Sequence, residues 1–266
     1  MLPKIYIILV NYEGWHDTIE CLESVFKSGY SNFTVIVVDN KSKKKSLEYI
    51  KAWANGALNV WNKDKLRHFS FPPSPKPIKY LFYNGEIPET TFTEQNEKLI
   101  LVRSDENNGF AAGNNIALKY ILNKNEYEYV WLLNNDTVIT PQTLPALLDA
   151  IAKNGKYGAM GSKVFYYDDP KLLQNIGVKI NKKSFLKLYK PILNLKIKNY
   201  YTEEPADHFE VDDIMGASLF IKKEVLLKIG LMPEQYFLYG EETDWNLDIK
   251  RAGYKLGTSL NSEVFH

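Results

Sequence analysis

The chain has 266 residues, of which 45% are hydrophobic and 24% charged, and its formal net charge is +1. A chain this close to neutral lacks the charge excess of polyanion-binding proteins, so we expect no nucleic-acid partner. A single cysteine, Cys21, excludes an intrachain disulfide and fits a reducing compartment, and no Cys and His cluster has zinc-site spacing. No stretch approaches the ~20 apolar residues of a membrane span, so we expect a soluble, cytoplasmic chain.

The first half of the sequence alternates apolar runs with helical patterns. Residues 4–10 and 33–39 are continuous β-branched runs, which are typical of parallel strands covered on both faces. Between them, apolar residues at helical spacing predict a helix that Asp17 caps and Gly29 ends. These elements make a strand–helix–strand unit.

Two further pairs of strand and helix follow. Residues 98–104 predict a strand that leads into a helix ending near Leu122, and the apolar run from Tyr129 predicts a fourth strand. Thr140 and Pro141 predict the start of the next helix. Its apolar face comprises Leu144, Leu147, Leu148 and Ile151. This alternation indicates an α/β fold with a wound, mostly parallel central sheet flanked by helices, which binds ligands at the carboxyl ends of its strands.

Two segments depart from this pattern. Residues 55–97 are rich in prolines and polar turns, and we interpret them as an insertion with enough aromatic residues for a hairpin. Residues 171–202 contain eight lysines and no acid. Such a run is usually a solvated face, and the alternative is contact with an anionic lipid or a phosphate-bearing acceptor at a membrane surface.

Polar residues follow each of the four predicted strands. They are Asn11, the pair Asp39 and Asn40, the segment 107–115, and the run Asn134, Asn135 and Asp136. A single polar residue in such a place usually just makes a turn. All four sets converge on one crevice, where carboxylates and amides can contact a nucleobase or ribose and a lone carboxylate beside a diphosphate can hold a divalent ion.

Seven segments of the chain, in this order, resemble the family 2 glycosyltransferases of the GT-A fold, especially their rhamnosyltransferase-like branch. They are "ILVNYEGWHDTIECLESV", "VIVVDNKS", "ENNGFAAGNNIAL", "YVWLLNNDTVITP", "VDDIMGASLFIKKEVLLKIG", "YFLYGEETDWNLDIKRAGYKL" and "EVFH". The resemblance implies one GT-A domain over residues 1–266, with a nucleotide-binding half over residues 1–128 and a metal and acceptor half over residues 129–266. It also implies that relatives continue past the position of His266.

The resemblance assigns a nucleoside site to the first half. Asp39 matches the acid that pairs with a uracil or thymine ring, and Gly109 and Gly113 match positions of close packing next to the donor. These glycines do not form a dinucleotide fingerprint, because the G-x-G start is missing. The other residues assigned to the donor site are Val10, Asn11, Tyr12, Asn40, Ser42, Asn114 and Asn135.

A metal site is also implied by the resemblance. Asp136 matches the last position of an Asp-x-Asp motif that binds Mg²⁺ or Mn²⁺ on the donor diphosphate, and His266 matches the histidine that completes the site. Asn134 replaces the first acid of that motif. The nucleotide must then supply more of the negative charge, so we expect weak metal affinity in its absence.

The general base is expected among the acids of "GEETDW". Glu242 matches the catalytic position of the family, and Glu241 and Asp244 are the other candidates. On spacing alone these acids are accounted for by a helix N-terminus, where the helix dipole favours negative charge. The resemblance instead favours an acid that takes the proton of the acceptor hydroxyl.

The resemblance therefore implies an inverting, metal-dependent transfer from a UDP- or dTDP-sugar, with dTDP-rhamnose favoured, to a glycan or lipid-linked acceptor of surface polysaccharide. Two other classes stay open. A sugar nucleotidyltransferase would carry a Gly-rich loop with Arg and Lys after the first strand, which "NYEGWHD" does not supply. A non-catalytic nucleotide-sugar-binding protein would bind donor without turnover.

Overall fold

The computed structural model describes residues 2–43, 45–59, 65–88, 97–153, 155–179, 190–191 and 207–266. Most of the basic segment 171–202 lies outside the described residues, so its contact with a membrane or acceptor stays a prediction. Among the described residues, no helix has both the length and the apolar character that a membrane crossing needs.

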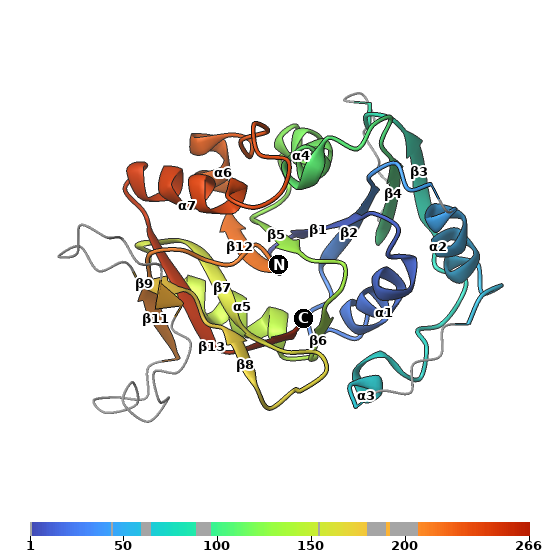
Figure 1. Ribbon diagram of the computed structural model, residues 1–266, viewed down its shortest axis with the longest axis horizontal. Coiled ribbons are helices and arrows are strands. Elements are labelled where there is room, and N and C mark those ends of the chain that lie inside the picture. The colour runs from blue at the N-terminus through green and yellow to red at the C-terminus, as the bar shows by residue number, and fades with distance from the viewer. Residues whose placement is uncertain are drawn as a thin grey trace.

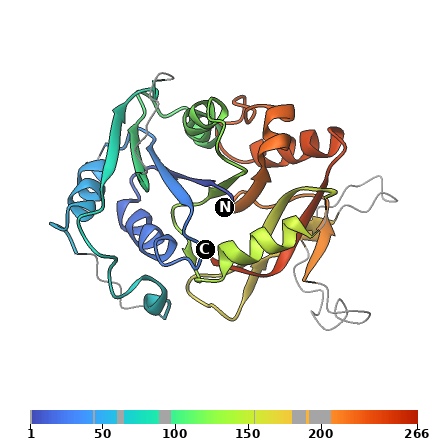
Figure 2. The ribbon, with the colours of Figure 1, turned by 180° about the vertical axis from the view of Figure 1, so that it is seen from behind.

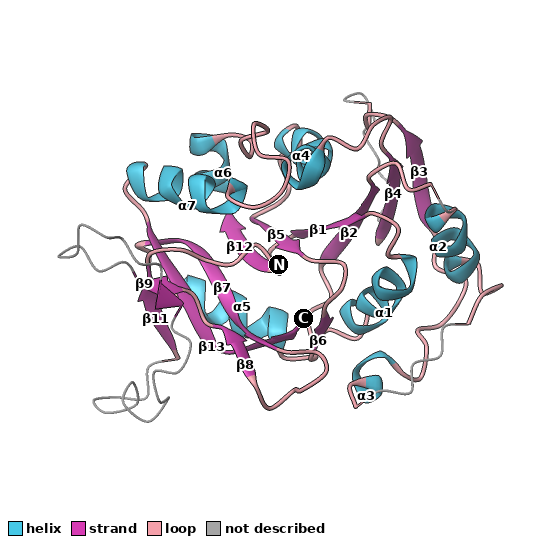
Figure 3. Ribbon diagram, in the orientation of Figure 1, coloured by secondary structure: helices cyan, strands magenta, loops and turns pink. Residues whose placement is uncertain are grey.

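Five parallel strands form the first half of the central sheet (Figures 1 and 3). Their order is β5 (Tyr129–Leu133), β1 (Ile5–Asn11), β2 (Phe33–Asp39), β4 (Leu99–Arg103) and β3 (Tyr80–Asn84), and each pair of neighbours is parallel. The apolar runs of β1, β2 and β4 are buried on both faces, as the sequence predicts. The wound parallel arrangement is thereby confirmed.

The second half of the same sheet is mixed. Strand β12 (Ser218–Lys222) lies antiparallel to β5, and beyond it follow β7 (Tyr157–Phe165), β13 (Lys255–Phe265) and β11 (His208–Val211). Strand β13 runs parallel to β7 and antiparallel to β11. The shorter strands are β6 (Val138–Ile139) on β13, β8 (Leu173–Asn175) on β7, and the separate pair β9 (Val178–Lys179) and β10 (Lys190–Pro191).

Helices cover both faces of the sheet (Figures 1 and 2). One apolar cluster packs α1 (Trp15–Val25), α2 (Ser46–Ala54) and α5 (Thr143–Ala152) against alternate strand residues such as Ile7 and Val35. The other packs α4 (Gly109–Leu122), α6 (Lys223–Ile229) and α7 (Glu241–Arg251) against Ile8 and Ile36. The period of two along each strand decides which helix layer a side chain meets.

Several predicted helix ends are wrong by a few residues. Helix α1 begins after Gly14 rather than at a cap on Asp17, which lies in its first turn, and it ends at Val25, before Gly29. Helix α5 begins at Thr143 instead of at Thr140. Asp17 still sits where the helix dipole favours an acid. The apolar face of α5 is correct, because Leu144, Leu147 and Ile151 are buried and Leu148 packs against them.

The predicted hairpin in residues 55–97 is also wrong for the described part of that segment. Strand β3 extends the parallel sheet beside β4, and the short helix α3 (Arg67–Ser70) precedes it. The residue pattern of a strand does not show whether it pairs in a hairpin or at the edge of a parallel sheet, because the pairing partner comes from elsewhere in the chain.

A buried carboxylate attaches this segment to the helices. Oε1 of Glu23, in α1, accepts hydrogen bonds from the Trp53 indole N–H (2.7 Å) and from Lys76 Nζ (2.9 Å). Its Oε2 accepts from the backbone N–H of Ser74 (2.6 Å). Glu23 is only 5% exposed, so these donors have little access to water. The carboxylate thus joins α1, α2 and the inserted segment.

We expect Glu23→Ala to lower the free energy of unfolding by about 3 kcal/mol, because it leaves a buried indole, a backbone amide and an ammonium group without their acceptor. Urea denaturation measures this change. The exposed Glu128 provides the matched control, since Glu128→Ala should change the stability by no more than about 0.5 kcal/mol. Equal effects of the two substitutions would contradict the structural role of Glu23.

Candidate active site

The carboxyl ends of the parallel strands bring the predicted polar residues to one edge of the sheet. Asn11 and Asp39 are direct neighbours in the register of β1 and β2. Asn134 to Asp136 follow β5, which flanks β1 on its other side. Tyr12 continues from Asn11 and is 46% exposed. These residues therefore lie along one edge of the sheet, which we call the rim, and they form three clusters there.

The first cluster surrounds the buried carboxylate of Asp39. Its Oδ1 accepts hydrogen bonds from Asn11 Nδ2 (2.6 Å) and from the Ser42 hydroxyl (2.5 Å). Burial raises the pKa of Asp39, and the hydrogen bonds from Ser42 and Asn11, with the charge of Arg103, offset part of that rise. The structure thus brings together three residues that the sequence assigned to nucleoside binding.

Asn40 and the start of α4 extend this cluster. Asn40 Nδ2 donates to Asn107 Oδ1 (2.8 Å) and to the carbonyl of Gly109 (3.0 Å). Its Oδ1 is buried and has no hydrogen-bond donor among the described residues. A Cβ on Gly113 would lie 2.9 Å from Val10 Cγ1, so this glycine lets α4 approach β1 closely.

Thr18 connects the first cluster to the loop after β5. Its hydroxyl donates to Asn11 Oδ1 (2.9 Å) and accepts from Asn135 Nδ2 (2.9 Å). Thr18 is fully buried in α1. No sequence pattern identifies this residue, because a threonine inside a helix carries no sign of its distant partners. The chain from Asp39 through Asn11 and Thr18 to Asn135 is continuous.

The second cluster contains the predicted metal ligands. His266 Nε2 lies 3.4 Å from Asp136 Oδ1 and 3.2 Å from Asn134 Nδ2. Burial acts to raise the pKa of Asp136, but the hydrogen bond and charge of His266 outweigh it, so that this pKa is below its ordinary value. Within the described part of the chain, no three His, Cys, Asp or Glu side chains gather as a metal site.

Gln174 orients the imidazole of His266. His266 Nδ1 lies 3.0 Å from Gln174 Oε1, and because the amide oxygen can only accept, Nδ1–H donates this hydrogen bond and fixes the orientation of the ring. Gln174 comes from β8, 92 positions away in the chain. Because of this separation, no local sequence pattern identifies Gln174 as a partner of His266.

Thr137 and Cys21 contact the loop that carries Asp136, and the charge of Asp136 acts on a second acid, Asp17. Thr137 Oγ1 donates to the carbonyl of Asn134 (2.7 Å), and Cys21 Sγ lies 3.7 Å from the same oxygen. Burial raises the pKa of the Cys21 thiol to about 12, so the thiol stays protonated. Burial and the charge of Asp136 both raise the pKa of Asp17.

The third cluster is centred on Glu242 and lies next to the second cluster. The backbone N–H of Asn134 donates to the carbonyl of Ala217 (3.1 Å), which joins the end of β5 to the loop before β12. Gly216 of that loop lies against Glu242, because a Cβ there would meet the Glu242 side chain at 3.6 Å. Glu242 Oε2 is buried without a partner among the described residues.

Helix α7 is held in this position by Asp213. Its Oδ1 accepts from Asn246 Nδ2 (2.6 Å) and its Oδ2 from the Thr243 hydroxyl (3.0 Å). Burial raises the pKa of Glu242; backbone hydrogen bonds oppose the rise, and the neighbouring Glu241 and Asp213 carboxylates add to it. Burial also raises the pKa of Glu241. Both glutamates thus ionise less readily than an exposed carboxyl.

Two predicted residues do not join these clusters. Asp244 Oδ2 lies 3.4 Å from Gln235 Nε2 and from the Tyr236 hydroxyl, on the preceding loop. Asn114 Nδ2 donates to the carbonyl of Phe110, one turn earlier in its own helix (3.0 Å). Neither side chain forms a hydrogen bond with the polar residues at the strand ends among the described residues.

A family model decides the identity of the chain. The model described as glycosyl transferase family 2 matches residues 6–72 and 87–229. The chain belongs to this family. The residues it leaves unmatched between those two ranges include strand β3.

Individual relatives of this glycosyltransferase agree with the family assignment. The low-salt glycan biosynthesis hexosyltransferase Agl10 of Haloferax volcanii is 22% identical over 270 residues, which cover 100% of this chain and 68% of that protein. Two solved structures share the GT-A fold at 16% identity each. One is the mannosyltransferase PcManGT from Pyrobaculum calidifontis with GDP-Man and Mn²⁺ (TM-score 0.63), and the other is GalNAc-T7 with UDP, GalNAc and Mn²⁺ (TM-score 0.66).

All of this glycosyltransferase chain aligns with each of those two structures, but it spans only 57% and 44% of their chains. The likeness therefore shows the fold. The rhamnosyltransferase-like branch stays a prediction, because the curated relative is described as a hexosyltransferase.

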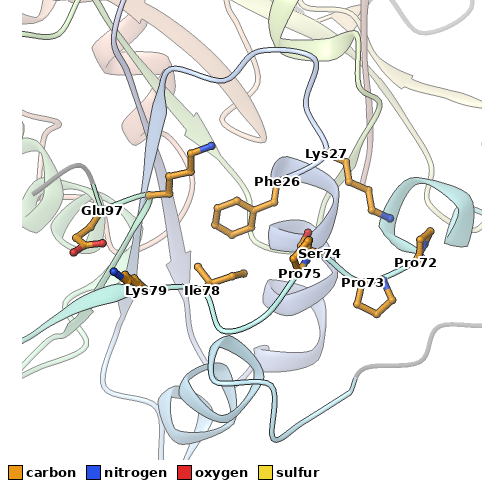
Figure 4. A pocket seen from close by; sticks show the side chains of 10 residues that line it. Phe26, Lys27, Pro72, Pro73, Ser74, Pro75, Ile78, Lys79 and Glu97 are labelled. Carbon is orange, nitrogen blue, oxygen red and sulfur yellow. The ribbon is translucent and has the colours of Figure 1, made fainter.

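A cleft of about 700 Å³ lies elsewhere on the molecule (Figure 4). Phe26, Ile78 and several prolines line it, with Lys27, Lys79 and Lys98 at its rim. Lys27 follows the end of α1, and Lys79 and Lys98 precede β3 and β4, so this cleft is at the amino ends of the strands. It is therefore separate from the three clusters.

We expect Gln174→Leu to weaken Mn²⁺ binding in the presence of nucleotide about 10- to 100-fold, because the imidazole of His266 loses the acceptor that holds it. Titration with Mn²⁺ at saturating nucleotide measures the effect. Gln174→Glu is the matched control, since it keeps an acceptor oxygen at the same distance from the backbone and should keep the affinity. Unchanged binding in Gln174→Leu would contradict the orienting role.

Proposed function

We propose that this glycosyltransferase catalyses an inverting, metal-dependent transfer of a sugar from a UDP- or dTDP-sugar, with dTDP-rhamnose as the favoured donor. The observation that carries the proposal is the adjacency of the second and third clusters. The hydrogen bond between Asn134 and Ala217 places the Asp136 loop beside the loop that contacts Glu242. The loop that carries the carboxylate for the metal thus lies beside the loop that contacts the carboxylate for the acceptor, on α7.

The donor extends along the rim in this proposal. Asp39 faces the nucleobase, where its carboxylate accepts the imide N–H of uracil or thymine, and the unpartnered Oδ1 of Asn40 accepts a ligand hydroxyl or N–H. The hydrogen bonds of Thr18 with Asn11 and Asn135 connect this nucleobase end of the site to Asn135, where the diphosphate lies in the proposal. The neighbours bound to GDP-Man and to UDP support a nucleoside diphosphate donor.

Asp136 and His266 fit a divalent ion that also binds the donor. One carboxylate and one imidazole leave most ligand positions to phosphate oxygens and water, and this mixed donor set suits Mn²⁺ better than Mg²⁺. When bound, the ion neutralises charge on the departing diphosphate. The Mn²⁺ in both neighbouring structures supports this choice.

Glu242 is the proposed general base. Its carboxylate accepts the proton of the acceptor hydroxyl while that oxygen attacks the anomeric carbon, and the bond from this carbon to the diphosphate oxygen breaks on the opposite face. Asp213 orients the helix that carries the base. Glu241 is less suitable because it is only 3% exposed, and Asp244 faces Gln235 and Tyr236.

The acceptor in this proposal is a glycan or lipid-linked saccharide of a surface polysaccharide, reached at the cytoplasmic side of the membrane. The described role of the Haloferax volcanii relative in glycan biosynthesis supports a glycan acceptor. The continuous sheet from β11 to β3 supports one domain with a nucleotide-binding half and a metal and acceptor half.

Incubation with radiolabelled UDP-, dTDP- and GDP-sugars in Mn²⁺ tests the proposal. We expect thermal stabilisation and slow release of labelled sugar with a UDP- or dTDP-sugar. Asp136→Ala should remove the Mn²⁺-dependent part of the donor affinity, while Asp149→Ala, on the exposed side of α5, should keep it. Binding of donor with no release of sugar, even with glycan acceptors added, would indicate a non-catalytic binding protein.

We expect Glu242→Gln to reduce turnover by about 10²-fold or more with little change in donor affinity, because the amide cannot accept the proton. In the unmodified enzyme, turnover should fall as the pH is lowered through a pKa above the ordinary glutamate value of about 4.3. That dependence should disappear from the residual activity of the variant. Steady-state kinetics between pH 5 and 8 measure both effects.

Glu241→Gln and Asp244→Asn are the isosteric controls for this prediction. Each should retain most of the turnover, since neither carboxylate acts as the base in the proposal. A larger loss in one of these variants than in Glu242→Gln would assign the base to that residue.

A further inference from the structure

The loop before α7 exposes three large apolar side chains in succession. Phe237, Leu238 and Tyr239 are 62%, 53% and 79% exposed. Single exposed apolar residues are common on protein surfaces, but a contiguous group of this kind marks an interaction site. We call residues 237–239 the aromatic loop.

The backbone before the aromatic loop and at its first residue is attached to α4. Asn115 Nδ2 donates to the carbonyl of Met232 (2.9 Å), and the N–H of Met232 donates to Asn115 Oδ1 (2.9 Å). The carbonyl of Phe237 accepts from the N–H of Phe110 (3.0 Å). The exposed side chains therefore project from an ordered backbone, which lowers the entropic cost of binding a ligand.

Gly109 makes this attachment possible. Its φ is +93°, and a Cβ there would lie 2.1 Å from the carbonyl oxygen of Phe237, so only glycine allows the contact. The carbonyl of Gly109 in turn accepts from Asn40 in the nucleoside cluster (3.0 Å). Figure 1 shows the chain between α6 and α7 passing beside α4. The aromatic loop thus borders the proposed donor site.

The other end of the aromatic loop leads directly to the proposed base. Tyr239 has a φ of +69° and Gly240 a φ of +101°, and α7 begins at the next residue with Glu241 and Glu242. A non-glycine residue in this left-handed region is costly, so the turn is maintained by its attachments on both sides. Tyr239 is thus three residues and Phe237 five residues before Glu242 in the chain.

The sequence segment that carries the aromatic loop is rich in acids. Residues 231–249 contain Glu234, Glu241, Glu242, Asp244 and Asp248 and no lysine or arginine. An acidic surface repels the anionic lipids of a cytoplasmic leaflet. It suits a ligand rich in hydroxyl donors, because carboxylates accept hydrogen bonds from hydroxyl groups. The charge therefore favours a saccharide over a membrane as the partner of this loop.

We propose that Phe237 and Tyr239 form the acceptor platform, on which an uncharged saccharide ring stacks with its apolar C–H face while neighbouring carboxylates accept its hydroxyl groups. The proposal rests on the proposed function and deepens it, because it names the chemical class of the acceptor unit next to the base. An aromatic face supplies contact area at little conformational cost, and the carboxylates supply orientation.

Saturation-transfer-difference NMR tests this acceptor platform. The protein is saturated with UDP or dTDP and Mg²⁺, and methyl glycosides of glucose, galactose and mannose are the probes. We expect saturation on the ring C–H protons of at least one glycoside. Tyr239→Ala and Phe237→Ala should each reduce it about fivefold or more, while the aromatic replacement Tyr239→Phe should retain most of it.

Leu238→Ala is the matched control, since it removes an equally exposed apolar side chain that has no aromatic face. It should leave the glycoside signal within about twofold of the original. The thermal midpoint and the nucleotide affinity of every variant are measured in parallel, and they should match those of the unmodified protein because all three side chains are exposed.

Three outcomes overturn the acceptor platform. Nucleotide binding without saturation of any glycoside rejects it and leaves the proposed function standing. An equal loss of signal in Leu238→Ala rejects stacking. If the protein sediments with vesicles of phosphatidylcholine and phosphatidylglycerol, and both Leu238→Ala and Tyr239→Ala abolish this sedimentation, the loop binds a membrane instead of a saccharide. If no nucleotide binds, the proposed function fails first and the acceptor platform fails with it.

Discussion

The antiparallel pairing of β12 with β5 is the constraint on which the site depends. Ser218 at the start of β12 pairs with Leu133 at the end of β5. The loop before β12 therefore lies beside the loop after β5, although 84 positions separate Asn134 from Ser218. Because Gly216 in the first loop contacts Glu242 and the second carries Asp136, a change in this register would separate the two carboxylates.

Buried polar groups supply the rigidity around this junction. Asp39, Asn11, Thr18 and Asn135 form one continuous chain of hydrogen bonds at the strand ends, and Asp213 attaches α7 through two further bonds. Such groups are costly to bury unless their partners are in place, so the network favours one arrangement of these loops. A site that must align a donor, an ion and an acceptor benefits from that rigidity.

The balance of charge along the rim also has a physical explanation. Asn134 removes one acid from the expected metal motif, while Asp17 places another carboxyl group within reach of the Asp136 charge. Further along, the segment 231–249, which includes the aromatic loop, contains five acids and no basic residue. The strand ends thus combine amides with single carboxylates, and the acids are concentrated in the segment that includes Glu242.

The sequence by itself determined which apolar runs form the buried strands of a mostly parallel sheet, because β-branched runs and helical spacing are local properties that burial selects directly. It also placed Asn11, Asp39 and Asp136 at strand ends. Helix ends at Asp17 and Thr140 were predicted wrongly, since caps depend on single residues and the chain around them. Only the tertiary structure brought Thr18 to Asn135, Gln174 to His266 and β3 to β4, because these contacts join distant segments and local patterns carry no record of the partner.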